Sequence, residues 1–90
     1  MKMTNYANVR SKQRGIPPLI VEWLEEYGAV TYDHHGGQKK FFDKRSRKLL
    51  SKRYGKEVVD RMGSLMNTYL VVESGHIITV AHRQKHINRN

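Results

Sequence analysis

The fold is decided by residues 68–81, which read TYLVVESGHIITVA. Two runs rich in β-branched residues, Thr68 to Val72 and Ile77 to Ala81, flank the sequence Glu73-Ser74-Gly75-His76, whose composition is typical of a tight turn. The pattern predicts a β-hairpin in the C-terminal part of the chain.

Upstream of this hairpin, the sequence predicts a second hairpin with a helix before it. Residues 29–33 and 38–42 are rich in β-formers, and the turn His34-His35-Gly36-Gly37 joins them. Residues 16–27 carry apolar side chains at helical spacing, and Pro17-Pro18 suits the first turn of that helix.

Two further helices are predicted between the hairpins. Asp43 suits the N-cap of a basic helix over about 44–54, which Gly55 ends. A second helix over about 56–66 repeats apolar residues at helical spacing. The element order α-ββ-αα-ββ indicates an α+β domain, with about four antiparallel strands in two hairpins packed against three short helices.

Neither end of the chain shows a periodic pattern. Residues 1–15 are polar and basic, and we interpret them as a flexible basic arm. Residues 84–90 are interpreted as a basic C-terminal tail. The expected organisation is therefore a single globular domain over residues 16–83.

Positive charge is concentrated in the middle of the chain. The protein has 17 Lys and Arg residues against 8 Asp and Glu, a formal net charge of +9. Eight of these cations lie among the fifteen residues from Lys39 to Arg53, where Asp43 is the only acidic residue. Because concentrating like charge in a folded element costs self-repulsion, this segment predicts a polyanionic partner, and nucleic acid is the first candidate.

The predicted basic helix places Lys44, Lys48 and Lys52 on one face, since they are four residues apart. A row of cations of this kind matches the spacing of phosphates, whereas the ordinary alternative is a lysine-rich solvated face. The apolar residues of the helix are expected to face the core, and they are Leu49, Leu50 and Tyr54. The predicted nucleic-acid contacts are Lys39, Lys40, Lys44, Arg45, Arg47, Lys48, Lys52, Arg53, Arg83 and Lys85.

Phe41 and Phe42 directly precede this helix. Neighbouring residues of a strand point to opposite faces, so one Phe is expected to enter the core and the other to face out. An outward Phe, or Tyr32 across the hairpin, would be placed to stack on an unpaired base. The alternative is that a helix covers the second Phe.

The end of the last strand suggests a different chemistry. Cleavage of RNA needs a proton carrier for the reacting oxygens and a cation for the charge that develops on the phosphate. His82 suits the first role and Arg83 the second. The alternative is plain phosphate binding, and strand alternation would place His82 on the face of Ile78 and Val80, with Arg83 on the other face.

The block TYLVVESGHIITVAHRQKH, residues 68–86, resembles the end of small RelE-like and BrnT-like bacterial toxins. Those proteins have a Tyr-led apolar strand, a short turn, a second apolar strand and a His-Arg or Arg-rich exit. The resemblance implies a small basic, metal-independent ribonuclease with a neutralising acidic protein partner. Its candidate catalytic or RNA-contact residues are Tyr69, His82 and Arg83. The hairpin between the first helix and the helix pair departs from this pattern.

Composition argues against several other classes of protein. There is no Cys, which excludes disulfides and zinc–thiolate sites. His82 and His86 would lie roughly 13 Å apart in an extended segment, so no metal or other cofactor is predicted. The sequence lacks the apolar runs of a signal peptide and of a membrane span. We therefore expect a soluble cytoplasmic protein of bacterial or phage type without a membrane partner. The small size of the chain also leaves open whether it forms a homodimer.

The leading interpretation is a small basic domain that binds nucleic acid, with RNA or single strands favoured, and that docks phosphates through residues 39–53. The first alternative is a toxin-like ribonuclease that uses His82 and Arg83. The second alternative is a protein-interaction module whose acidic helix face, formed by Glu22, Glu25 and Glu26, docks a basic partner.

Overall fold

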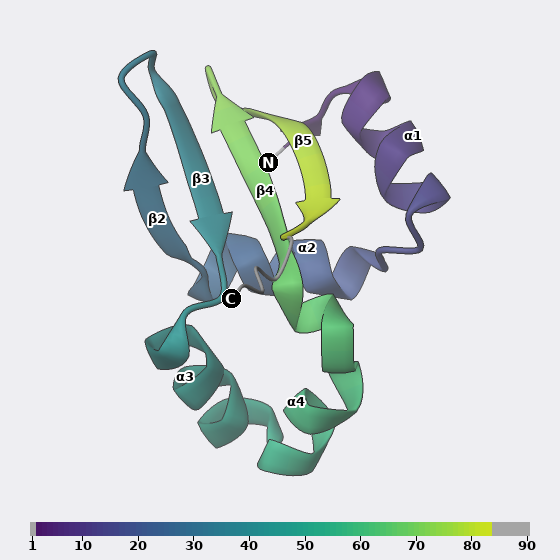
Figure 1. Ribbon diagram of the computed structural model, residues 1–90, viewed down its shortest axis with the longest axis vertical. Helices are drawn as coiled ribbons and strands as arrows, with labels where there is room; N and C mark the ends of the chain where they lie inside the picture. Colours follow the sequence, from purple (N-terminus) through teal and green to yellow (C-terminus); the bar gives the residue numbers. More distant parts are fainter. Residues whose placement is uncertain (1, 84–90) are drawn as a thin grey trace, which may run out of the picture.

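Five strands form one mixed sheet in the order β1-β5-β4-β3-β2 within residues 2–83, the part of the chain that the computed structural model describes (Figure 1). The two predicted hairpins are both present and pair with each other through β3 and β4, and β1 adds to β5 in parallel. The strands are β1 (Lys2–Met3), β2 (Ala29–Tyr32), β3 (Gly37–Phe41), β4 (Thr68–Glu73) and β5 (His76–His82).

The hairpin of β4 and β5 turns through Ser74 and Gly75, which have φ values of 51° and 76°. Two successive positive φ values are typical of the turns whose twist matches that of the flanking strands. Ile78 is bulged out of the ladder, because the residues on its two sides pair with consecutive residues of β4. Strand alternation predicted that Ile78 and Val80 share one face of the sheet. The bulge shifts the pattern by one residue, so Ile77 rather than Ile78 is buried with Val80.

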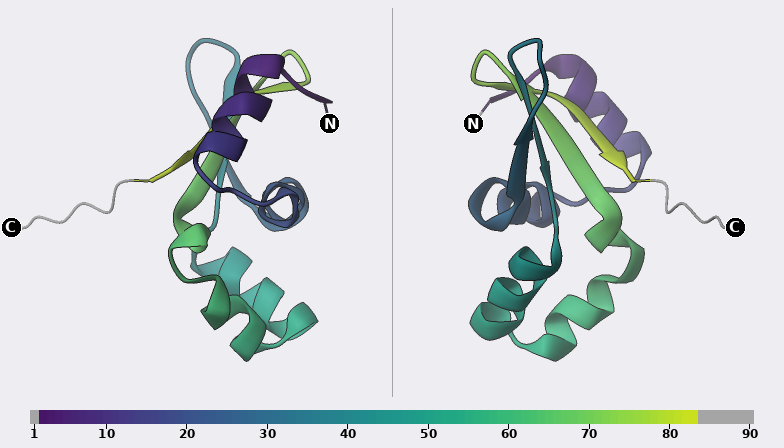
Figure 2. Two further views of the ribbon diagram at one scale, coloured as in Figure 1. Left: turned by 90° about the vertical axis from the view of Figure 1, so that its right-hand side faces the viewer. Right: turned by 60° about the vertical axis from the view of Figure 1, so that its left-hand side comes forward.

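The helices occupy two places relative to the sheet. They are α1 (Asn5–Gln13), α2 (Pro18–Tyr27), α3 (Lys44–Tyr54), α4 (Lys56–Met62) and the 3-10 helix η1 (Gly63–Asn67). Figures 1 and 2 show α1 and α2 on one face of the sheet, and α3 and α4 as a pair beyond its end, inserted between β3 and β4. No helix of residues 2–83 lies over the opposite face, which we call the open face.

The α+β class is confirmed, but the expectation of a flexible arm over residues 1–15 was wrong. This segment supplies β1 and α1, so the folded region begins at Lys2 rather than at residue 16. Thr4 caps α1, because its Oγ1 accepts a hydrogen bond from Ala7 N at 3.2 Å. Only the small residues Ala7 and Ser11 are buried in α1, which explains why hydrophobic periodicity did not reveal the helix.

The remaining differences concern element number and length. The sheet has five strands, one of them parallel, and the described residues form four α-helices rather than three. The helix expected over about 56–66 ends at Met62, because Gly63 adopts a positive φ of 53° and the chain continues as η1.

The hydrophobic core lies between the sheet and the helices on its covered face, and extends to the α3–α4 pair. Trp23 of α2 stacks on Tyr54 of α3 with ring centroids 5.0 Å apart, which ties the helix pair to the rest of the domain. No helix within residues 2–83 is long and apolar enough to cross a membrane. The largest fully buried apolar side chains are Ile20, Leu24, Leu50, Leu70, Ile77 and Val80.

Candidate nucleic-acid interface

The orientation of α3 is fixed by its N-cap and by its buried side. Asp43 Oδ1 accepts hydrogen bonds from the backbone nitrogen and the hydroxyl of Ser46, both at 2.8 Å. The backbone bond, and then the hydroxyl bond, hold the pKa of Asp43 below its ordinary value. Ser46 and Leu50 are buried, so the opposite side of α3 faces solvent.

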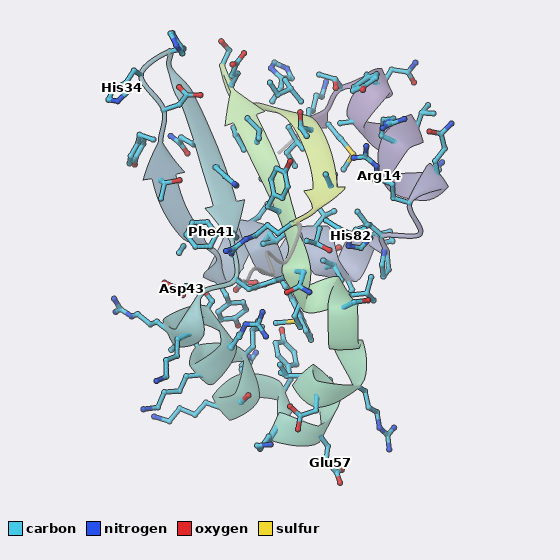
Figure 3. All side chains as sticks on the ribbon, viewed as in Figure 1. Arg14, His34, Phe41, Asp43, Glu57 and His82 are labelled. Carbon is cyan, nitrogen blue, oxygen red and sulfur yellow. The ribbon has the colours of Figure 1, made fainter. Side chains whose placement is uncertain are left out.

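The solvent-facing side of α3 carries a row of cations that we call the basic stripe. Figure 3 shows nitrogen-tipped side chains extending from the outer side of this helix. The helix itself contains no acidic residue that would neutralise them. Leu49 was expected in the core but is 43% exposed beside the stripe. The stripe consists of Lys44, Arg45, Lys48 and Lys52, all exposed.

Three of the predicted contact residues make internal contacts instead of standing free. Arg47 Nη2 donates to the carbonyl of Met66 at 3.2 Å and so links α3 to η1. Lys40 Nζ lies 3.4 Å from the carbonyl of Glu25 on α2. The guanidinium of Arg53 lies 5.8 Å from the ring centroid of Tyr54. Arg47 and Lys40 link separate elements, so they are weaker candidates for phosphate contact than the stripe. Arg53 contacts a neighbour in its own helix and stays exposed.

The open face carries a second group of candidate residues. Phe41 and Tyr69 are paired directly across β3 and β4, and both are half-buried. Phe42 is buried with 2% of its surface exposed, which confirms that one Phe enters the core and the other does not. Tyr32 is the most exposed large aromatic of the sheet, at 73%, but alternation along β2 puts it on the other side of the sheet from Phe41.

Each ring of this pair lies under a cation. Lys39 Nζ is 4.5 Å from the centroid of Tyr69, and Arg83 Cζ is 5.2 Å from the centroid of Phe41. The backbone nitrogen of Arg83 donates to the carbonyl of Asn67, which anchors the residue just beyond β5. A shallow hollow of about 210 Å³ is lined by Thr31, Lys39, Phe41 and Arg83. The group Lys39, Phe41, Tyr69 and Arg83 is called the aromatic platform below.

His82 is directed away from this platform. Its Nε2 lies 3.5 Å from the carbonyl oxygen of Arg14, at the end of α1, and Figure 3 shows Arg14 and His82 on the same side of the molecule. Arg83, the next residue, lies over Phe41 on the open face. The structure therefore brings Tyr69 and Arg83 into one cluster but separates His82 from both.

The other titratable candidates do not form a site. His34 and His35 are exposed in the β2–β3 turn, where Asp33 Oδ1 accepts hydrogen bonds from the backbone nitrogens of His35 and Gly37 at 2.7 and 2.8 Å. Within residues 2–83, no group of three or more His, Cys, Asp or Glu side chains is placed to hold a metal ion. Lys85, His86 and the predicted tail over 84–90 lie outside the described residues.

The acidic helix face is divided by the fold. Glu22 and Glu26 are exposed on α2, whereas Glu25 is half-buried.

Comparison of the chain with models of known protein families, with curated proteins and with solved structures gave no match. The resemblance to RelE-like and BrnT-like toxins stays a prediction.

Proposed function

We propose that this protein binds nucleic acid, with RNA or single strands favoured, and that the basic stripe on α3 docks the phosphates. One observation carries the proposal: four exposed cations follow each other along one side of a capped helix that contains no acidic residue. Such a row costs self-repulsion in the free protein, and a polyanion removes that cost while its counterions are released.

The proposal is for contact with the backbone rather than for reading of sequence. Phosphate contacts position a protein on nucleic acid without carrying sequence information. The stripe begins at Lys44, only three residues after Phe41, so one strand of nucleic acid could follow both α3 and β3. Cleavage is not part of the proposal, because His82 and Arg83 are directed to different sides of the sheet.

Substitution of Lys44, Lys48 and Lys52 by Gln tests the proposal. We expect weaker binding to every sequence alike and a log–log salt slope shallower by about 2 to 3, since each lysine neutralises about one phosphate. The fold should be unchanged by circular dichroism, because all three side chains are exposed. Binding is measured by fluorescence anisotropy at several salt concentrations.

A matched triple variant controls for the loss of net charge. Lys2, Lys12 and Arg61 are also exposed but lie outside α3, and their replacement by Gln removes the same charge. This control should retain most of the affinity and the salt slope. Equal losses in the two triple variants would mean that general charge, not the stripe, attracts the ligand.

A further inference from the structure

The open face of the sheet carries a second, chemically different set of contacts. Phe41 and Tyr69 sit directly opposite each other on adjacent antiparallel strands, so their side chains project from the same face. Their direct cross-strand neighbours on that face, Ala29 and Ala81, are small, and both rings stay partly exposed to solvent. A pair of accessible rings on a sheet is the arrangement on which single-stranded RNA stacks its bases.

Cations stand on both sides of the ring pair. Lys39 comes from β3 and lies over Tyr69, while Arg83 follows β5 and lies over Phe41. A base that stacks on either ring brings its phosphate close to the cation that covered that ring. Each cation can therefore contact a phosphate when a base takes its place over the ring. The planar guanidinium of Arg83 can also stack on a base.

We propose that the aromatic platform is a stacking site for two neighbouring unpaired bases, held by Phe41 and Tyr69, with Lys39 and Arg83 neutralising the adjoining phosphates. The ligand class is single-stranded nucleic acid, because a duplex keeps both faces of each internal base stacked on its neighbours. This inference rests on the proposed function and adds to it the source of a preference for single strands.

The test compares Phe41→Leu and Tyr69→Leu with wild type on a short unstructured RNA and on a duplex of the same length. Stacking on one aromatic ring is strong enough that each Leu variant should bind the single strand about tenfold more weakly. Binding to the duplex should stay the same, because phosphate contacts alone carry it. The readout is the ratio of the two dissociation constants for each variant.

Two control variants isolate the ring from other properties of the site. Tyr69→Phe keeps the ring and removes only the hydroxyl, so it should bind both ligands as wild type does. Tyr32→Leu removes an aromatic that is more exposed but lies on the other side of the sheet, and it should also leave both affinities unchanged. A loss for Tyr32→Leu equal to that of the platform variants would overturn the proposal.

A second measurement does not depend on the variants folding. Ultraviolet crosslinking of the wild-type protein to the single strand should attach it at Phe41 or Tyr69, and attachment only elsewhere would overturn the platform. If the Leu variants keep full single-strand affinity while the α3 triple variant loses it, the platform is wrong and the stripe stands. If wild type binds neither ligand, both proposals fail together.

Discussion

At the scale of the residue, the proposed stacking of bases would exchange the cation over each ring of the platform for a base. A cation over an exposed ring contributes about 0.5–1 kcal/mol, whereas a base stacked on an aromatic side chain contributes about 1–3 kcal/mol. The exchange therefore favours the base even before the released cation meets a phosphate. Lys39 lies over the ring of Tyr69 and Arg83 over the ring of Phe41, and under the proposal both would contact the phosphates of the stacked bases.

The placement of His82 leads to a prediction about cleavage. A metal-independent ribonuclease needs its proton carrier and its cation at the same phosphate, and His82 lies by Arg14 while Arg83 lies over Phe41. We expect wild-type protein to retain RNA without cutting it between pH 5 and pH 8, and His82→Ala to bind as wild type does. Labelled RNA on one gel shows retention and cleavage together. Cleavage that drops on the order of 100-fold in His82→Ala would instead establish the enzyme.

At the scale of the element, α3 depends on its N-cap. Asp43→Ala removes the acceptor for two hydrogen bonds of Ser46, so we expect a loss of about 1 kcal/mol in the free energy of unfolding at neutral pH. Urea denaturation measures this difference. Asp60→Ala, which removes only an exposed ion pair with Lys56 in α4, is the control and should cost much less.

The contribution of Asp43 should also depend on pH. Its pKa is lower in the folded protein than its ordinary value of 3.8, so the ionised carboxylate stabilises the fold above that value. The stabilisation is lost as the pH falls below about 4 and through the lowered folded pKa. The difference between wild type and Asp43→Ala should therefore shrink in acid. A difference that stays constant from pH 7 to pH 3 would show that the charge of the cap is unimportant.

The elements that the sequence could predict were those with a strong local pattern. The hairpin over residues 68–81 was clear from its β-branched runs, and α3 from the cap at Asp43. Helix α1 was missed because it buries only two small residues and carries no apolar period. Thr4, a good N-cap type, was the one local signal that could have indicated it.

For the aromatic platform, the sequence could predict which side chains face outward but not which strands lie side by side. Alternation along a strand indicated that one of Phe41 and Phe42 faces outward. The same rule places Tyr69 on the face of the sheet opposite to that of its buried neighbour Leu70. What local patterns could not supply is the pairing of β3 with β4, because the whole α3–α4 insertion separates these strands in sequence. The partners of each ring were therefore visible only once the sheet was assembled.

At the scale of the whole molecule, the cations of the aromatic platform lie on the face of the sheet opposite to the acidic residues of α2. Glu22 and Glu26 are exposed on α2, which covers one face, whereas Lys39 and Arg83 lie on the open face, which also carries Glu73. A polyanion that approaches the open face meets Lys39 and Arg83, and the basic stripe lies beyond the end of the sheet, where Figure 2 shows α3. The net charge of +9 adds a general attraction that salt screens.

The most direct test of nucleic-acid binding is the salt dependence of affinity for a short single strand, measured with wild-type protein. If four to six cations reach phosphates, the logarithm of the association constant should fall linearly with the logarithm of salt concentration, with a slope of about −3 to −5. The single strand should also bind more tightly than a duplex of equal length at every salt concentration. An affinity that does not change with salt, or the absence of binding at low salt, would contradict the account.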